Sequence, residues 1–413
     1  MNPLRVFTTR SLETNIPKFF LHSFFYAFML WLPIWVIFLQ EDHGMSLTQV
    51  TIFDVAFWLT MAISEVPTGA VADTIGRKRS LLISLLLAAV SITLFAMAPN
   101  FTILLIGNSL WAIAITFMSG ADLAFFYDTL KALGRENEYK NLRGKLLTFT
   151  LASIAISSAL GGIIAETSLA LPFLIYLIFL ALSIGLVFLL EEPPSEPHPD
   201  TGGKLSYRQT LQITLDTIRQ RPNLRFSLLY SNLMPLGVFI ISIIFIQPYA
   251  VEIGLPYTAL GFLALGLRAV EMLASANADR LVKTTGEWNW IRFAPIMIVI
   301  GLIGIGIIPT VVGIFIYAIA AFSSAATRPL VEDLIQRQTS SSVRATILSV
   351  DSLIRTLMLA LVEPLLGIIA DARGLPYSFL VMAAGTAVII FSLLLRWRHH
   401  WNEIPPQHET DQR

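Results

Sequence analysis

Long apolar stretches alternate with short polar links over most of this chain. A helix that crosses the hydrocarbon core of a bilayer needs about 20 apolar residues, and twelve stretches approach or exceed this length. They lie near residues 19–40, 46–72, 79–98, 101–130, 145–166, 171–190, 224–250, 256–280, 292–309, 311–335, 345–370 and 376–396. The pattern therefore predicts an all-α polytopic membrane protein with twelve transmembrane helices.

A polar segment rich in Pro and Gly interrupts this pattern near the middle of the chain. It predicts a six-helix bundle over 1–190, a cytoplasmic linker over 191–222, a second six-helix bundle over 223–398 and a cytoplasmic tail over 399–413. Within the linker, apolar positions at helical spacing predict a short amphipathic helix. These positions are Leu205, Leu211, Leu215 and Ile218, opposite Arg208, Gln212 and Arg219.

Basic residues gather in alternate links between the apolar stretches. Of the 28 Lys and Arg residues, all but Arg268, Arg328, Arg355 and Arg373 fall in the set of links that begins with the amino terminus. Because cytoplasmic loops carry an excess of Lys and Arg, we expect both termini in the cytoplasm and the protein in the cell membrane. We see no cleavable signal sequence, so the first span directs targeting.

Composition excludes several other classes of protein. Hydrophobic residues make up 55% of the chain and charged residues 14%, with zero net charge and no cysteine. We therefore expect no nucleic-acid partner, no disulfide and no thiolate metal site. There is also no phosphate-binding Gly-x-x-x-x-Gly-Lys-Ser/Thr sequence and no nucleophile–base or metal-ligand cluster. These absences argue against an enzyme, a bound metal and a cofactor, so a gradient has to supply the energy for any transport.

Short sequences of the first half recur in the second half. With an offset of 206 residues, Asp73 maps onto Asp279 and Glu65 onto Glu271. With an offset of 205 residues, the sequence Gly-Ile-Ile-Ala at 162–165 maps onto the same sequence at 367–370. Parallel six-span halves related by an axis along the membrane normal are a known transporter plan. The repeats therefore predict two pseudo-symmetric six-helix bundles.

The link between the second and third predicted spans carries the most specific motif. It reads Gly69-x-x-x-Asp73-x-x-Gly76-Arg77-Lys78-Arg79, and we call residues 69–79 the signature loop. It resembles the corresponding loop of the major facilitator superfamily (MFS), and segments 65–69, 127–131, 143–144 and 344–349 resemble a bacterial subgroup of drug-efflux permeases. The resemblance implies the MFS fold, a monomer and alternating access. It also implies that Asp73 holds the cytoplasmic side closed.

Two departures from the family pattern bear on the direction of transport. Thr74 stands where the family usually has a basic residue, and Ser157-Ser158 stands where antiporters of the exporter type have Gly-Pro. The second departure keeps import or facilitated transport open.

The chemistry of the signature loop suggests a gate independently of the family. Gly69 and Gly76 permit close helix approach and a sharp turn, and Asp73 can accept backbone N–H bonds or pair with Arg77. Lys78 adds positive charge to the same link. The second-half echo, Asp279-Arg280, predicts a similar element. The alternative for the basic residues is a plain cytoplasmic anchor.

Ionisable residues inside spans are costly and are functional candidates by default. In the fourth span, Asn108, Trp111 and Asp122 share one helix face. Arg328 in the tenth span lies at a similar estimated depth, and the family resemblance places both spans around a central cavity. We hypothesise a state-dependent attraction between Asp122 and Arg328, with Asp122 accepting a proton when it breaks. The alternatives are a partner for Asp122 within its own half and an i,i+4 pair of Arg328 with Glu332.

Three further spans carry acids. Asp54 in the second span has no evident partner on its own helix and is a second candidate for the proton site, while Glu65 suits a structural or gating role. Arg268 lies three residues before Glu271, which predicts local neutralisation. In the eleventh span, Asp351 and Arg355 form a predicted i,i+4 pair. Glu363, before Pro364, remains open between coupling, helix packing and a shielded structural role.

Aromatic and polar residues of the first, fourth and seventh spans suggest a lining for an amphipathic or cationic solute. They are Tyr26, Trp31, Trp35, Trp111, Tyr230, Asn232 and Gln247. His22 is expected at the cytoplasmic interface. We therefore predict a proton-coupled exporter of a small amphipathic or cationic compound. A symporter or facilitator for a nutrient or metabolite is the alternative, and a non-transporting membrane sensor is the alternative from another class.

Overall fold

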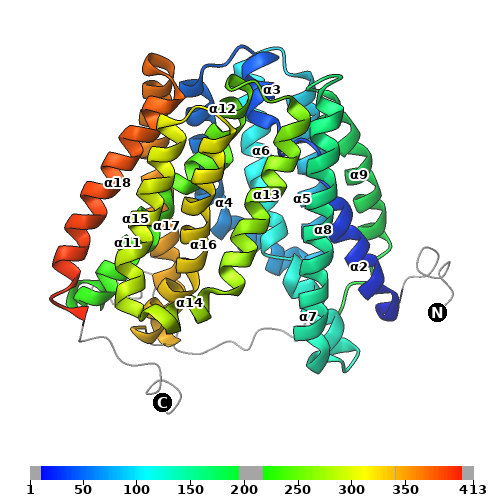
Figure 1. Ribbon diagram of the computed structural model, residues 1–413. Coiled ribbons are helices and arrows are strands. Elements are labelled where there is room, and N and C mark those ends of the chain that lie inside the picture. Colours follow the sequence, from blue (N-terminus) through cyan, green and yellow to red (C-terminus); the bar gives the residue numbers. More distant parts are fainter. Residues whose placement is uncertain (1–10, 195–216, 340, 402–413) are drawn as a thin grey trace. The chain divides into compact units, whose positions relative to one another are not determined.

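The computed structural model describes residues 11–194, 217–339 and 341–401, without the side chains of Asp73 and of residues 341–345. In these ranges the regular structure is helical, with no strand (Figure 1). Most of the amphipathic helix predicted over 205–219 lies outside the described residues. The all-α prediction is confirmed for the part of the chain that the structure covers.

The first half of the chain forms eight α-helices and one short 3-10 helix within its described residues. They are α2 (Leu12–Ala27), α3 (Trp35–Glu41), α4 (Leu47–Ile75), α5 (Arg77–Met97), α6 (Phe101–Ser119), α7 (Asp122–Ala132), η1 (Glu136–Glu138), α8 (Tyr139–Ala165) and α9 (Leu171–Phe188).

The second half forms eight α-helices and one π-helical turn within its described residues. They are α11 (Pro222–Ile240), η2 (Ile241–Phe245), α12 (Ile246–Glu252), α13 (Tyr257–Ala276), α14 (Ala278–Thr285), α15 (Glu287–Ile307), α16 (Val311–Arg337), α17 (Ser341–Arg373) and α18 (Leu375–Trp397).

Eleven helical segments of the described chain are long and apolar enough to cross a membrane. The first predicted span is divided into α2 and α3 by residues 28–34, so neither part reaches that length alone. Pro33 lies in this break, and proline has no N–H to continue the helical ladder. With this divided segment the helices account for the twelve predicted spans, and the chain is a multi-pass membrane protein.

Three other spans are also irregular. The fourth is divided at Gly120-Ala121 between α6 and α7, and the eighth at Asn277 between α13 and α14. The seventh contains the π-helical turn η2, beside which Tyr317 donates a hydrogen bond to the carbonyl of Val238 (2.8 Å). Broken helices and π-turns are common at functional sites of membrane proteins.

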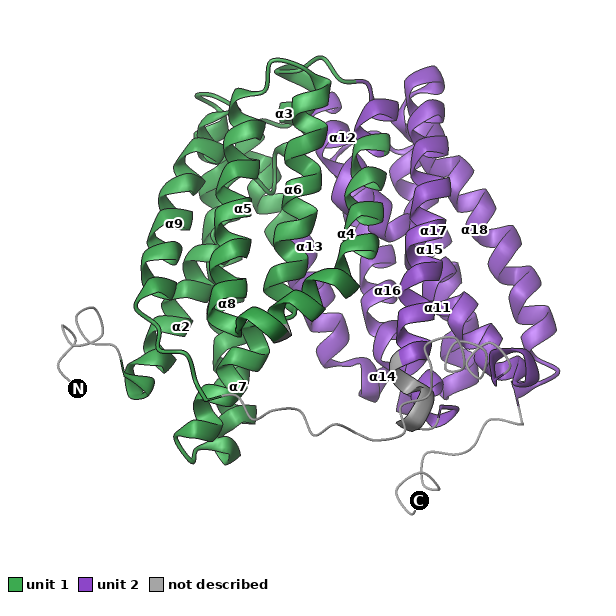
Figure 2. Cartoon of the chain, turned by 180° about the vertical axis from the view of Figure 1, so that it is seen from behind, with its two compact units in different colours: residues 1–45, 52–199, 255–265 green, residues 46–51, 200–254, 266–413 purple. Residues whose placement is uncertain are grey.

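The chain forms two compact units (Figure 2). Unit 1 comprises Met1–Met45, Ile52–Pro199 and Leu255–Leu265, and unit 2 comprises Ser46–Thr51, Asp200–Gly254 and Gly266–Arg413. The first turn of α4 therefore belongs to unit 2, and the first half of α13 belongs to unit 1. The sequence-based boundaries at 190 and 223 remain predictions.

Each unit contains a tightly packed antiparallel helix pair in which small residues allow close approach. In unit 1, Ser84 and Ser91 of α5 donate hydrogen bonds to the carbonyls of Ala114 and Gly107 on α6 (2.6 and 2.7 Å). In unit 2, Ser323 of α16 donates to the carbonyl of Ala294 on α15 (2.9 Å). Since apolar side chains gain little by moving from lipid into the protein, such close packing and hydrogen bonding stabilise membrane helices.

Candidate functional site: the signature loop and the acids within the spans

The signature loop turns sharply at Gly76, whose φ of 93° lies in the left-handed region that favours glycine. Arg77, the first residue of α5, pairs with Asp128 on α7 (3.1 Å), and both side chains are largely buried. The predicted pair of Arg77 with Asp73 stays a prediction, because the structure does not describe the Asp73 side chain. A Cβ on Gly69 would meet nothing within 4 Å, so packing does not require glycine there.

Glu192, just after the sixth span, stabilises the turn at Gly76 by capping the start of α5. Its carboxylate accepts hydrogen bonds from the backbone N–H groups of Arg77 (2.8 Å) and Lys78 (3.0 Å). The Lys78 ammonium in turn donates to the carbonyls of Phe188 (3.0 Å) and Leu190 (2.5 Å). A carboxylate thus satisfies the free N–H groups at the start of α5, and a lysine satisfies free carbonyls at the end of α9.

A second lysine completes this cluster. Lys18 of α2 is fully buried (0% exposed) and donates to the carbonyl of Leu189 (2.8 Å) and to Thr14 (2.9 Å). Asn15 exchanges hydrogen bonds with the backbone of Glu191. By sequence alone, Lys18 is one of the basic residues of the cytoplasmic links and Glu192 is part of the linker. The available signal was a polar residue beside each predicted helix end.

The second-half echo is built differently. Asp279 pairs with Lys283 (2.6 Å) on the exposed side of α14, and Arg280 is also exposed. The following turn at Gly286 again has positive φ (85°). Here the first residue of α15 is Glu287, which pairs with Arg337 at the end of α16 (2.8 Å). The pair matches Arg77–Asp128 in position and has the opposite polarity.

Asp122 lies where the fourth span is interrupted. It is the first residue of α7, and its Oδ1 accepts the N–H of Leu123 (2.5 Å). The positive end of the α7 dipole favours an ionised carboxylate at this place. The charge of Asp122 acts on Tyr26, and the charge of Arg143 acts on Asp122. Arg143 acts on Asp122 electrostatically within the same unit, and a bonded side-chain partner for Asp122 in its own half stays a prediction.

Aromatic side chains cluster in unit 1 where the first span is divided. Trp111 stacks on Tyr26 (centroids 6.5 Å apart) and meets Trp31 edge to face (5.4 Å). The indole nitrogen of Trp31 is buried and has no hydrogen-bond partner among the described residues. Because buried donors are normally satisfied, this N–H is a candidate contact for a solute.

The other polar candidates of unit 1 have structural partners. Asn108 donates to the carbonyl of Phe53 (2.6 Å) and so joins α6 to α4. Asp54 accepts a hydrogen bond from the indole of Trp58 one turn later (2.8 Å), so the expectation that it has no partner on its helix was wrong. His22 is buried against Ser183 (2.6 Å) on α9, and its depth in the membrane stays a prediction.

In unit 2, Arg328 pairs with Glu332 (2.7 Å), and both side chains are exposed. This is the alternative partner given by its spacing, and the Asp122–Arg328 attraction stays a prediction. Arg268 and Glu271 pair as expected (2.6 Å). Glu363 is fully buried on α17.

A polar network in unit 2 joins α11 to α17. Asp351 accepts hydrogen bonds from Asn232 (2.7 Å), Ser231 (2.9 Å) and Arg355 (3.1 Å). The predicted Asp351–Arg355 pair is confirmed, and the sequence pattern missed its two partners on α11. The Arg355 side chain is 49% exposed. It projects opposite the exposed Leu353 and Leu357, two residues away on either side, because two helical residues span about 200°.

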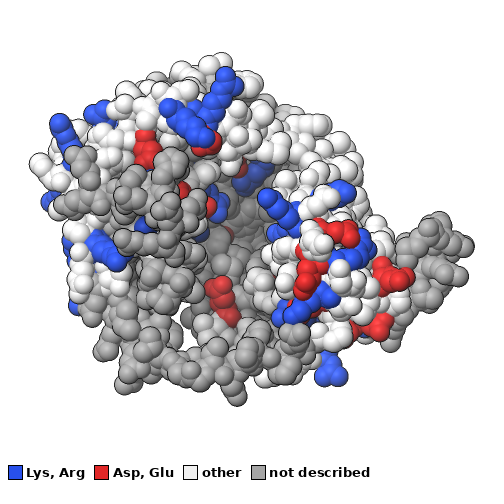
Figure 3. Space-filling model, turned by 90° about the horizontal axis from the view of Figure 1, so that it is seen from below, with Lys and Arg blue, Asp and Glu red and all other residues white. Residues whose placement is uncertain are grey.

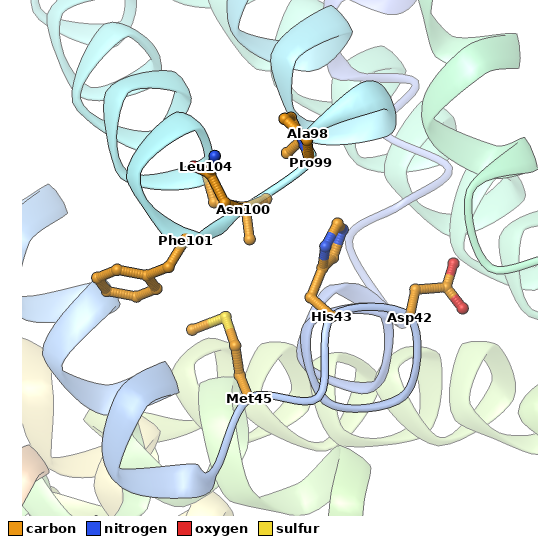
Figure 4. Close-up of a pocket in the computed structure, with 8 residues that line it drawn as sticks. All are labelled: Asp42, His43, Met45, Ala98, Pro99, Asn100, Phe101 and Leu104. Atoms are coloured by element: carbon orange, nitrogen blue, oxygen red, sulfur yellow. The ribbon is translucent and has the colours of Figure 1, made fainter.

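A pocket of about 270 Å³ lies in unit 1, where the loop after α3 meets the turn between α5 and α6 (Figure 4). The His43 ring points toward the turn that holds Pro99 and Asn100, and it packs edge to face on Phe38 (4.8 Å). Burial lowers the pKa of His43 and raises the pKa of Asp42 beside it. No group of three metal-binding side chains occurs among the described residues.

Charged side chains are conspicuous at one end of the molecule. Viewed from below, many Lys, Arg, Asp and Glu side chains are visible on this face (Figure 3). Clustering of charge at a membrane protein's end keeps it out of the hydrocarbon region.

Three solved structures of membrane transporters have a fold similar to that of this chain. A bacterial homolog of the human lysosomal transporter Spinster, inward-facing and unoccupied, is 14% identical with a TM-score of 0.73, over 98% of this chain and 100% of that chain. The nucleoside transporter NupG is 13% identical with a TM-score of 0.71, over 94% and 99%. A D-xylose-proton symporter is 13% identical with a TM-score of 0.64, over 93% and 98%.

At these identities the likeness concerns the fold alone. No curated protein sequence matches the chain. The family model of the Major Facilitator Superfamily matches residues 19–363, which include the signature loop, Asp122 and Glu363. The chain therefore belongs to the Major Facilitator Superfamily and is a membrane transporter.

Proposed function

We propose that this protein exports a small amphipathic or cationic compound across the cytoplasmic membrane in exchange for protons. The observation that carries the proposal is the position of Asp122 at the interruption of the fourth span, where its charge acts on Tyr26 of the aromatic cluster. Aromatic faces bind cations and apolar groups. A carboxylate within a span can exchange a proton when its neighbouring charges move.

The two halves of the chain carry out the transport cycle together. The bundles over 1–190 and 223–398 alternate in exposing a central cavity to each side of the membrane. Both termini lie in the cytoplasm and the protein works as a monomer. The gate of the first half consists of Gly69, Asp73, Gly76, Arg77 and Lys78. Asp279 and Arg280 form the weaker counterpart.

Solute-dependent proton flux in proteoliposomes that contain a pH dye tests the proposal. We expect cationic drugs to drive proton movement in the wild type and not in Asp122→Asn. Asp54→Asn tests the second candidate acid in the same assay, and Glu138→Gln, an exposed surface pair with Arg135, controls for reconstitution. Proton-coupled transport that survives in Asp122→Asn but is lost in Asp122→Ala contradicts the protonation role of Asp122.

A second candidate function is a proton-coupled symporter or facilitator for a polar nutrient. The network of Ser231, Asn232, Asp351 and Arg355 favours it, because hydrogen-bonding groups held at fixed positions suit a polar solute. A nucleoside transporter and a D-xylose-proton symporter are among the solved structures of similar fold. Proton movement with nucleosides or sugars, and none with cationic drugs, supports this alternative. Substitution of Arg355 with Gln then abolishes it.

A further inference from the structure

The repeated sequence Gly-Ile-Ile-Ala is followed by an acid in both halves. Glu166 follows the copy that begins at Gly162, and Asp371 follows the copy that begins at Gly367. The first copy ends α8 and the second lies in the last turns of α17, on the membrane side opposite the signature loop when the spans are counted. The transport site described above uses neither acid.

In unit 1, Glu166 caps the start of α13. Its Oε1 accepts hydrogen bonds from the N–H (2.8 Å) and the hydroxyl (3.0 Å) of Thr258, the second residue of that helix. Pro256, just before the helix, has no side-chain oxygen, so Glu166 provides the acceptor that the sequence around α13 lacks. Tyr257, the first residue of the helix, donates to Glu41 (2.5 Å).

In unit 2, Asp371 caps the start of α4 in the same way. Its carboxylate accepts from the N–H of Leu47 (2.9 Å) and from the N–H (2.9 Å) and hydroxyl (2.6 Å) of Thr48, again the second residue of the helix. Two acids 205 positions apart thus make the same contact with two threonines. Chance surface pairing does not account for this correspondence.

The glycine four residues before each acid explains the geometry. A Cβ on Gly162 would lie 2.6 Å from the carbonyl oxygen of Tyr257, and a Cβ on Gly367 would lie 2.5 Å from the hydroxyl of Thr51. Residues four apart share a helix face. The glycine therefore lets the two helices touch, and the acid one turn later reaches the exposed N–H groups of the crossing helix.

Both contacts join a helix of one half of the sequence to a helix of the other half. In a transporter whose halves rock against each other, such contacts have to break in one state of the cycle. We propose that Glu166 and Asp371 are paired latches that hold this end closed and release it during transport. The proposal requires only that the protein is a transporter, and it holds for export and import alike.

Cysteine accessibility tests the latches without any substrate, and the chain contains no native cysteine. Leu260→Cys places a probe in the second turn of α13, where the side chain is 2% exposed. Leu348→Cys places a probe near the other end of α17, where the side chain is 53% exposed and shares a helix face with Asp351 and Arg355. Labelling by a polar maleimide is followed in nanodiscs.

We expect Glu166→Ala and Asp371→Ala each to raise the labelling rate of the Leu260 probe by roughly fivefold to tenfold, as expected for loss of a helix N-cap. The double variant should exceed either single variant, and labelling of the Leu348 probe should fall. Glu252→Ala, which removes an exposed acid at the end of α12, should change neither rate.

Unchanged labelling of the Leu260 probe in the double variant overturns the proposal. Faster labelling of both probes also overturns it, because that shows a loosened fold and not a shift between states. If the alanine variants do not yield monodisperse protein, Glu166→Gln and Asp371→Asn enter the same assay with the same criteria. A failure of proton-coupled export in the flux assay would leave these labelling results unaffected.

Discussion

The starts of α5 and α15 occupy equivalent places in the two halves and differ in the sign of their charges. In unit 1, Arg77 begins the helix and pairs with Asp128 on α7. In unit 2, Glu287 begins the helix and pairs with Arg337 at the end of α16. Both follow a glycine with positive φ. An ion pair at this place is common to both halves, whereas its polarity is not.

The helix dipole explains why only unit 1 needs an additional acid. A helix amino terminus favours negative charge and disfavours positive charge. Glu287 supplies the favourable charge from its own position. Arg77 does not, and Glu192 approaches from the end of the sixth span to cap the N–H groups of Arg77 and Lys78. The comparison shows that one geometry can be stabilised by two arrangements of charge, with different demands on the surrounding chain.

The largest effect is expected from breaking the pair in unit 2. Arg337 is 4% exposed and also pairs with Asp333, so Arg337→Ala leaves two acids without their cation. We expect a loss of about 3 kcal/mol in the free energy of unfolding in mixed micelles. Arg328→Ala, at an exposed pair, serves as the control and should cost less than about 1 kcal/mol. Equal losses would show that the burial of Arg337 has no energetic consequence.

The polarity of the pair in unit 1 can be reversed to match unit 2. Arg77→Glu and Asp128→Arg should each lower the free energy of unfolding by about 2 kcal/mol, because each places like charges together. The double variant should regain at least half of the summed loss in the same denaturation assay. If the double variant is no more stable than the less stable of the two single variants, the Arg77–Asp128 and Glu287–Arg337 pairs are not equivalent.

Removing the cap tests the role assigned to Glu192. Glu192→Ala should cost about 1 kcal/mol in the wild-type background, as N-cap removal does. In the Arg77→Glu, Asp128→Arg background it should cost less, since the first residue then favours the dipole itself. Glu191→Ala is the matched control, because Glu191 makes its contacts with Asn15 through the backbone. An equal cost of Glu192→Ala in both backgrounds argues against the dipole explanation.

The smallest effect is expected at the echo of the signature loop. Asp279→Ala removes only an exposed pair with Lys283 and should change the free energy of unfolding by about 0.5 kcal/mol or less. Flux measured on the same variant then separates gating from stability. A loss of transport without a loss of stability would support a gate role for Asp279.

Residue spacing along a helix correctly predicted ion pairs within that helix. The Arg268–Glu271 and Asp351–Arg355 pairs follow from helical spacing of three and four residues. The contacts of Glu192 with the start of α5, of Lys18 with Leu189 and of Arg337 with Glu287 were missed, because these partners lie far away in the chain. The correspondence between Glu287 and Arg77 was also missed, because the two residues lie 210 positions apart. The sequence repeat that maps Asp73 onto Asp279 has an offset of 206.

The sequence by itself determined the class of protein, the number of spans, the internal repeat and the family. Each of these depends on hydrophobicity and spacing along one segment, and water and lipid act on every segment in the same way. Only the tertiary structure decided that Arg77 bonds to Asp128, that Lys18 and Glu192 satisfy helix ends, and that Glu166 and Asp371 cap α13 and α4. Burial leaves helix ends and charges in need of partners, and which partner arrives depends on how distant helices cross.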